Sequence, residues 1–230
     1  MKKAESESFT PAPEDVLVIR ITSDDCVNVD YLTEGHTFHK IVSAAGIIDA
    51  LRQSGVTRCI VKSGFLPTGC IAYSHEAESG NSYFVIEHFE RKADIAYQET
   101  RYNDFPLPRL VYGFRVSKDG RVSGVNVAVV ESEGELNEDT PTYLYPFSNV
   151  SGFGMCTGSN SLPVYKKTSA LKNLPNFILS IPDGDHHYKA QNTRLDLNYR
   201  DLLEHLKDKS PEYYYTDVLI KSNKKLKDFI

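Results

Sequence analysis

The chain has 230 residues, of which 40% are hydrophobic and 25% are charged, a composition typical of a globular protein with a sizeable core. Its net charge of -5 and its four cysteines without zinc-type spacing argue against a nucleic-acid-binding protein and against a metal centre. No segment has the length and apolarity of a signal peptide or a membrane span, so we expect a cytoplasmic protein without a membrane partner or a cofactor.

The first part of the chain predicts an N-terminal β-rich lobe. Residues 1–15 contain almost no large apolar side chains, which indicates a mobile N-terminal arm. Residues 16–21 and 26–38 have the patterns of a buried strand and a strand with its hairpin partner, and Ser43 is placed to cap a short helix. With the strands that follow, residues 16–100 form the predicted lobe with its one helix.

Alternating apolar and polar residues then predict a series of short antiparallel strands. These strands are expected at residues 58–62, 69–74, 82–89, 93–99, 110–116 and 122–130. Lys118-Asp119-Gly120 has the composition of a hairpin turn, because Gly accepts the positive φ that such turns require. Residues 142–145 are expected to add a strand, and residues 146–163 to be irregular.

The C-terminal part predicts the helical component of an α+β fold. Leu202, Leu203 and Leu206 lie at helical spacing within residues 197–207, which we expect to be an amphipathic helix packed against the sheet. The aromatic group Tyr213 to Tyr215 is expected to pack in the core. The basic run at Lys221, Lys224, Lys225 and Lys227 is expected to be a solvated helix end or a frayed tail.

The segment with the most chemical information is the polar, Gly-rich loop that contains Cys156. A thiol in such a loop can be both accessible and surrounded by backbone N–H groups, which favours reactivity. Free cysteines are also among the most buried residues, so composition alone leaves a reactive and a structural Cys156 both open.

Five ordered motifs across most of residues 60–160 carry a resemblance to one bacterial branch of the ubiquitin-conjugating superfamily. They are Leu66-Pro67, Pro108-Arg109-Leu110-Val111-Tyr112, Pro141-Thr142, Pro146-Phe147-Ser148-Asn149-Val150 and Cys156-Thr157-Gly158. Because it has these motifs in this order, the chain resembles prokaryotic ubiquitin-conjugating family D, also called the PRTRC system protein B family. Asn149 and Cys156 are seven residues apart, one fewer than in most eukaryotic conjugating enzymes, and the His of the eukaryotic His-Pro-Asn segment is missing.

This resemblance implies a fold and an activity. The fold would be an antiparallel meander sheet with flanking helices at residues 101–230, which leads into the loop of Cys156, plus the added N-terminal lobe. Cys156 would accept a ubiquitin-like protein as a thioester from an activating enzyme and transfer it to a nucleophile. A ubiquitin-like protein, an activating enzyme and a JAB-type isopeptidase are therefore the expected partners.

Two further sites each have a functional and an ordinary interpretation. The side-chain amide of Asn149 could stabilise the oxyanion of the transfer step, or it could tie down its own loop by bonding to nearby backbone. The family's later signature corresponds loosely to Phe177, Ser180 and either His186 or His187. One of these histidines could be the base that deprotonates the attacking nucleophile, or both could be exposed, solvated side chains after the polar turn of Asp183 to Asp185.

Two other functions use the same residues. A cysteine, a later His and a nearby Asn are also the components of a cysteine hydrolase that would act on ubiquitin-like C-termini. Against it, residues 154–161 contain too many Gly, Ser and Asn residues to begin the helix on which such nucleophiles often lie. The third hypothesis is a non-catalytic scaffold that only binds a ubiquitin-like protein.

Overall fold

The computed structural model describes residues 16–21, 26–33, 36–53, 63–76, 79–89 and 91–230. It divides the chain into two compact units, Met1–Lys62 and Ser63–Ile230. The predicted boundary at residue 100 is therefore wrong. The reason is that residues 82–88 pair along their whole length with residues 110–116, which places them in the sheet of the second unit. The predicted arm at 1–15 and the predicted strand at 58–62 lie outside the described residues.

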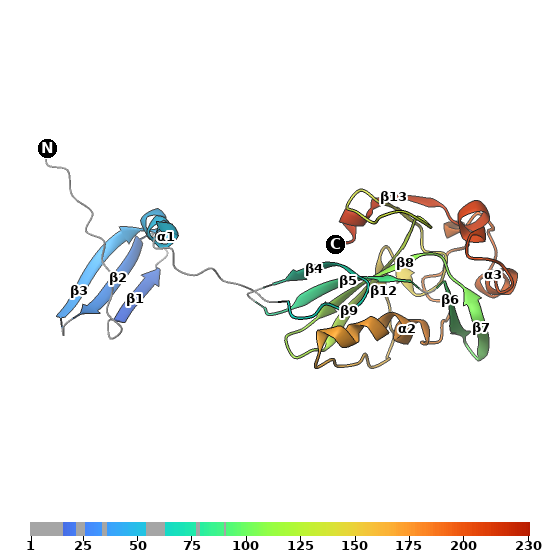
Figure 1. Cartoon of the computed structure of the whole chain (residues 1–230), viewed down its shortest axis with the longest axis horizontal. Coiled ribbons are helices and arrows are strands. Elements are labelled where there is room, and N and C mark those ends of the chain that lie inside the picture. Colours follow the sequence, from blue (N-terminus) through green and yellow to red (C-terminus); the bar gives the residue numbers. More distant parts are fainter. Residues whose placement is uncertain (1–15, 22–25, 34–35, 54–62, 77–78, 90) are drawn as a thin grey trace. The chain divides into compact units, whose positions relative to one another are not determined.

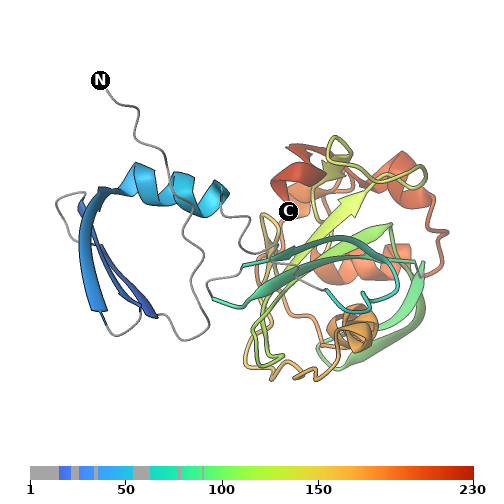
Figure 2. The same cartoon turned by 60° about the vertical axis from the view of Figure 1, so that its left-hand side comes forward.

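The first unit contains a three-stranded antiparallel sheet followed by one helix, as predicted (Figures 1 and 2). Its elements are β1 (Val16–Ile21), β2 (Cys26–Thr33), β3 (His36–Ser43) and α1 (Ala44–Gln53). The Ser43 Oγ accepts a hydrogen bond from the Gly46 N–H at 3.1 Å, which confirms Ser43 as the cap of this helix. Val27 and Val29 of β2 are buried.

The second unit is built on an antiparallel meander, which confirms the α+β class. Its neighbouring strands are β4 (Cys70–His75), β5 (Ser82–His88), β8 (Leu110–Val116) and β9 (Val122–Val130). The bounds of β8 and β9 are those predicted, because both strands are rich in β-branched or aromatic residues and the turn between them contains Gly120 at φ 83°. Gly120 also packs tightly, since a Cβ there would lie 2.0 Å from the Tyr165 carbonyl oxygen.

A second hairpin interrupts the meander between β5 and β8. It consists of β6 (Lys92–Tyr97) and β7 (Thr100–Pro106), which together form a separate two-stranded sheet. The sequence pattern did not predict β7. Its two buried aromatic residues, Tyr102 and Phe105, are three positions apart instead of two, and Asp104 between them has a φ of 50°, so the alternation expected of a strand is broken.

The C-terminal basic run is a strand, so the prediction of a solvated helix end or a frayed tail is wrong. This strand, β13 (Lys221–Lys225), pairs with β10 (Pro141–Tyr143), and β10 pairs in turn with β9. Its lysines stay exposed, and the Lys225 Nζ lies 2.9 Å from the Asp139 carboxylate. Backbone pairing thus places these lysines next to the acidic loop that precedes β10.

The remaining elements are short. The longest helix of this unit, α3 (Tyr199–Leu206), confirms the predicted helix at 197–207, and its leucines are fully buried. The others are η1 (Thr168–Asn173), α2 (Leu174–Leu179), η2 (Ala190–Asn192), the π-helical turn η3 (Tyr214–Val218) and η4 (Leu226–Asp228), with the two-residue strands β11 (Val150–Ser151) and β12 (Gly154–Met155). No helix among the described residues is both long and apolar enough to cross a membrane.

The two faces of the meander have different coverings. On one face, Phe84, Tyr112 and Val127 belong to the main core with residues of α2, α3 and η3. Tyr214 of η3 is fully buried, which confirms the packing predicted for the Tyr213 to Tyr215 group. On the other face, Val85 and neighbouring residues pack with Leu226 and Phe229 from the C-terminal end.

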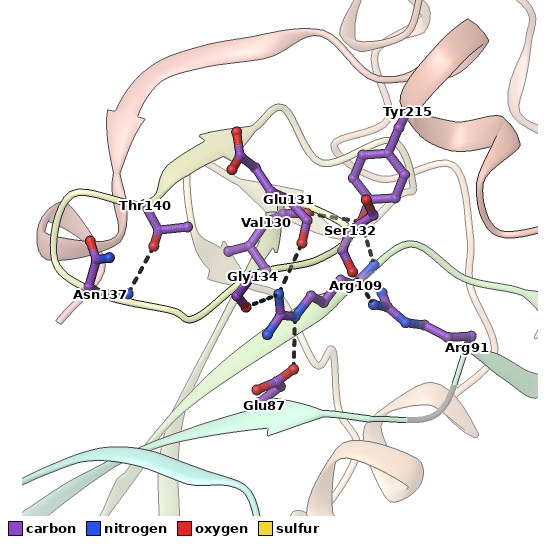
Figure 3. A network of polar contacts seen from close by, with 10 residues as sticks. All are labelled: Glu87, Arg91, Arg109, Val130, Glu131, Ser132, Gly134, Asn137, Thr140 and Tyr215. Carbon is purple, nitrogen blue, oxygen red and sulfur yellow. Dashed lines mark hydrogen bonds and ion pairs between the residues drawn. The ribbon is translucent and has the colours of Figure 1, made fainter.

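A buried ion pair fixes the edge of the meander next to the acidic loop at residues 131–139 (Figure 3). The Arg109 Nε lies 2.8 Å from the Glu87 carboxylate, and the two side chains are only 9% and 13% exposed. The Arg109 Nη1 also donates to the Gly134 carbonyl at 2.9 Å, and the Arg91 Nη2 donates to the Ser132 carbonyl at 2.7 Å. Two arginines thus hold the backbone of this loop against the ends of β5 and β8.

We expect Arg109→Met to lower the free energy of unfolding by about 3 kcal/mol, because it leaves the Glu87 carboxylate buried without a cation. Adding Glu87→Gln should recover part of this loss, since a neutral amide is less costly to bury than a carboxylate. Urea unfolding measures both changes.

Arg121→Met is the matched control. Arg121 lies 3.9 Å from Asp119, but both side chains are mostly exposed, so its loss should change stability by no more than about 0.5 kcal/mol. Equal effects of the two arginine substitutions would show that the buried pair does not support the fold.

Candidate functional site

Cys156 follows directly after a small hairpin at the edge of the meander. After β10, the chain passes through buried Phe147 and Ser148 and then forms β11 and β12, which are joined by a two-residue turn with Gly152 at φ 63°. The hairpin attaches to β9, because the Val127 N–H donates to the Phe153 carbonyl at 2.8 Å. Cys156 at its end is exposed, which is one of the two states that the loop composition left open.

The backbone brings Cys156, Asn149 and His186 together. The Cys156 N–H donates to the Asn149 carbonyl at 2.8 Å, and the Asn149 N–H donates to the His186 carbonyl at 2.6 Å. Asn149 has a φ of 62°, in the left-handed region that Asn tolerates better than most residues. Three residues selected from sequence are therefore neighbours, although their side chains are not what joins them.

The side chain of Asn149 bonds to a residue that sequence analysis did not select. Its Nδ2 donates to the Asp183 Oδ1 at 2.9 Å, and the other carboxylate oxygen of Asp183 accepts a hydrogen bond from the Tyr199 hydroxyl. Loss of hydration raises the pKa of Asp183 to about 6, even though the bonds from Tyr199 and Asn149 favour the charged form. The bond that Asn149 makes is thus a contact between two loops.

Asp183 is itself held on β6 through its backbone. The Asp183 N–H donates to the Ala96 carbonyl at 2.7 Å, and the Gln98 N–H donates to the Asp183 carbonyl at 2.9 Å. Two residues on, the Asp185 carboxylate accepts a bond from the Tyr97 hydroxyl at 2.7 Å. In the sequence, Asp183 was hidden as part of a Pro-Asp-Gly turn, where Asp is common for local reasons. The preceding run of Ile178 to Pro182 was the only signal that the carboxylate could lie beside apolar residues.

His186 and His187 are both exposed, as the polar turn before them predicted. His187 has a φ of 61°, and His186 contributes its carbonyl oxygen to the site. In the part of the chain that the structure describes, no hydrogen bond joins either imidazole to the Cys156 sulfur. A role of either histidine as a base therefore stays a prediction.

The reactive group that this site offers is the accessible thiol of Cys156, on a loop held by backbone hydrogen bonds. Within residues 63–76, 79–89 and 91–230, and within the described part of the first unit, no group of three His, Cys, Asp or Glu side chains could hold a metal ion. A small cavity beneath the loop is lined by Met155, Asp183, Phe147 and other mostly apolar side chains. The site thus combines an exposed cysteine with a partly buried carboxylate, Asp183, that a second loop contributes.

Comparison with known proteins gives no family for this chain. No protein-family model matches it, and neither the curated proteins nor the solved structures compared with it include a match.

We expect iodoacetamide to modify Cys156 about tenfold faster than Cys70 in the native protein. Cys70 is half-buried, its Sγ donates to the Ala72 carbonyl at 3.3 Å, and burial raises the pKa of its thiol. Peptide mapping after brief treatment measures both rates. The same measurement in denaturant is the control, because the difference should then disappear. Equal rates in the native protein would mean that the Cys156 loop is closed.

We also expect the stability difference between wild type and Asp183→Asn to depend on pH. The carboxyl has a pKa of about 6 when folded and 3.8 as its reference value, so at pH 5 the folded state holds a proton that the unfolded state has lost. Stability of the wild type relative to the variant should therefore rise by about 1.4 kcal/mol between pH 7.5 and pH 5.

Urea unfolding at the two pH values measures this change. The other ionisable side chains are the same in both proteins, so their contribution cancels in the difference. Asp185→Asn, on the same loop and exposed, is the control. A difference that stays constant, or that falls toward pH 5, would contradict a raised pKa at Asp183.

Proposed function

We propose that this protein is a ubiquitin-conjugating-like acyl transferase with Cys156 as its acceptor thiol. The observation that carries the proposal is the exposed Cys156, whose N–H bonds to the Asn149 carbonyl directly after the antiparallel meander. Strands in the order β5, β8, β9 and β10, then Asn149, then Cys156, are the arrangement that the sequence resemblance implies. Residues 63–230 would then be the conjugating core, and residues 16–62 the added lobe.

In the first step, the Cys156 thiolate attacks the thioester carbonyl that joins a ubiquitin-like protein to the activating enzyme. The new C–S bond forms, the old one breaks, and the enzyme's cysteine leaves as a thiolate. This exchange is nearly neutral in free energy, so its rate depends on the access and the thiolate fraction of Cys156. The exposure of its side chain supports such access.

In the second step, an amine attacks the thioester on Cys156 and the thiolate leaves. The tetrahedral intermediate carries negative charge on oxygen, which a nearby N–H donor stabilises. Asn149 Nδ2 has two hydrogens and the bond to Asp183 uses one, so the other is the proposed donor. The proton of the amine would pass to His186, to His187 or to water.

The proposed reaction defines the proposed partners. An activating enzyme supplies the acyl group in the cytoplasm, a ubiquitin-like protein is the group transferred, and a JAB-type isopeptidase would reverse the modification. A cysteine hydrolase is less well supported by the geometry, because no helix begins at Cys156 to lower the pKa of its thiol and residues 156–163 are not helical. The same experiment separates these two functions.

We expect the protein, mixed with the activating enzyme and ubiquitin-like protein of its source organism and with ATP, to form an adduct at Cys156 that added thiol cleaves. Cys156→Ser should give a thiol-resistant oxyester or no adduct. Cys70→Ser is the matched control and should load normally, because its thiol is half-buried on β4. Non-reducing gels and mass spectrometry measure the adducts.

Asn149→Ala tests the second step separately. It should slow transfer to an amine by about a hundredfold and slow loading much less, because the oxyanion donor acts in the transfer. No reducible adduct with the wild type, together with Cys156-dependent hydrolysis of a ubiquitin-like C-terminal ester, would replace the proposal with the hydrolase. Binding of the ubiquitin-like protein without either reaction would replace it with the scaffold.

A further inference from the structure

We propose that Asp183 is the positioning residue of the Cys156 loop, and that the ionised carboxylate holds the backbone of Asn149 in the conformation that receives the Cys156 N–H. This inference rests on the proposed function only in assuming that the Cys156 thiol accepts an acyl group. The hydrogen bonds, and the state of the loop that they determine, can be measured without any partner protein.

The first support is the chain of contacts from Asp183 to Cys156. The Asp183 Oδ1 accepts from the Asn149 Nδ2 at 2.9 Å, and the Asn149 carbonyl accepts from the Cys156 N–H at 2.8 Å. Asp183 is anchored to β6 on both sides of its peptide, by its bonds with Ala96 and Gln98. A fixed carboxylate on one element therefore orients the residue to which the Cys156 backbone is bonded.

The second support is the backbone conformation of Asn149. A φ of 62° lies in the left-handed region, which Asn visits more readily than most residues other than Gly, so local contacts decide whether Asn149 keeps it. Two contacts favour it here, the side-chain bond to Asp183 and the backbone bond to the His186 carbonyl. Weakening the Asp183 contact leaves Asn149 free to relax, and the carbonyl that receives the Cys156 N–H moves with it.

The third support is that stability alone does not account for an ionised Asp183. Burial raises its pKa to about 6, so at neutral pH the charged form destabilises the fold relative to a protonated carboxyl. The titratable groups that face it are Tyr199 of α3, Tyr112 of β8 and Tyr145 after β10. Among the described residues no Lys, Arg or His side chain forms an ion pair with Asp183. The neutral groups that favour its charge are the side chains of Tyr199, Asn149 and Ser148.

Protonation changes both of these bonds. Bonds from a neutral donor to a carboxylate are about twice as strong as bonds to a neutral acceptor. A protonated Asp183 also presents an O–H group where one oxygen had accepted a hydrogen bond. The contact with Asn149 should therefore weaken as the pH falls through about 6, and the Cys156 N–H should exchange more readily with solvent.

Hydrogen exchange of the Cys156 amide at pH 5 to 7.5 tests this inference. Rates are divided by those of an unstructured peptide at the same pH, which removes the intrinsic dependence of exchange on base. In the wild type we expect protection to fall about tenfold from pH 7.5 to pH 5, with a midpoint near 6. Asp183→Asn should show low protection throughout, without a step.

Tyr199→Phe gives a readout that a merely structural role would not produce. It removes one donor that favours the charged carboxylate, so the midpoint should move to higher pH. Asp185→Asn is the matched control on the same loop and should keep both the step and its midpoint. The wild-type curve and the Tyr199→Phe curve keep the test valid if Asp183→Asn does not fold.

Protection of the wild-type amide that stays constant from pH 5 to 7.5 would overturn the inference. A step that persists in Asp183→Asn, or a midpoint that Tyr199→Phe leaves unchanged or lowers, would overturn it as well. The step can be present in a protein that forms no thioester, in which case the positioning role stands and the proposed function fails. If the protein forms the thioester but protection of the Cys156 amide does not change with pH, the proposed function stands and the positioning role of Asp183 fails.

Discussion

The position of the candidate site depends on the pairing of β9 with two different strands, β10 and β12, along the same edge. β9 pairs with β8 along one edge, while its other edge pairs with β10 at Val129 and Val130 and with β12 at Asn126. The chain between β10 and β12 must therefore leave the sheet and return within a few residues. Its apolar side chains, such as Phe147, turn inward, and the next part of the chain carries Cys156 to the surface. Exposure of the thiol is thus a consequence of strand pairing.

Two partly buried carboxylates of this unit, Glu87 and Asp183, differ in how their charge is balanced. Glu87 has the guanidinium of Arg109 at 2.8 Å, and this ion pair holds a loop on the sheet. The groups that favour the charge of Asp183 are the neutral side chains of Tyr199, Asn149 and Ser148, and burial raises the pKa of its carboxyl. A charge without a cation in such a place is unfavourable at neutral pH, and residues of this kind concentrate at functional sites. Glu87 thus contributes to the stability of the fold, whereas the proposed role of Asp183 is to order the Cys156 loop.

Local patterns in the sequence determined what could be predicted. β8 and β9 are rich in β-branched or aromatic residues and are bounded by turn residues, and the leucines of α3 lie at helical spacing, so the positions of these elements follow from the sequence. β7 and β13 do not, because β7 contains an irregular residue at Asp104 and β13 is a polar strand that forms only because β10 offers an open edge. Loop composition left an accessible and a buried Cys156 both open, and the structure shows it exposed. Asp183 could not be found in this way, because its partners Asn149 and Tyr199 are 34 and 16 residues away.

The two interpretations of Asn149 that the sequence left open need not exclude each other. An amide group is planar, so a bond from one of its N–H groups fixes the direction of the other. The bond to Asp183 fixes the amide of Asn149 in this way, and a negatively charged acceptor also polarises the whole group. A donor oriented before the reaction stabilises a developing oxyanion without reorganisation, which is the condition under which such donors are most effective. The contact that orders the loop would therefore also prepare Asn149 for transfer, and both effects would depend on the ionised form of Asp183.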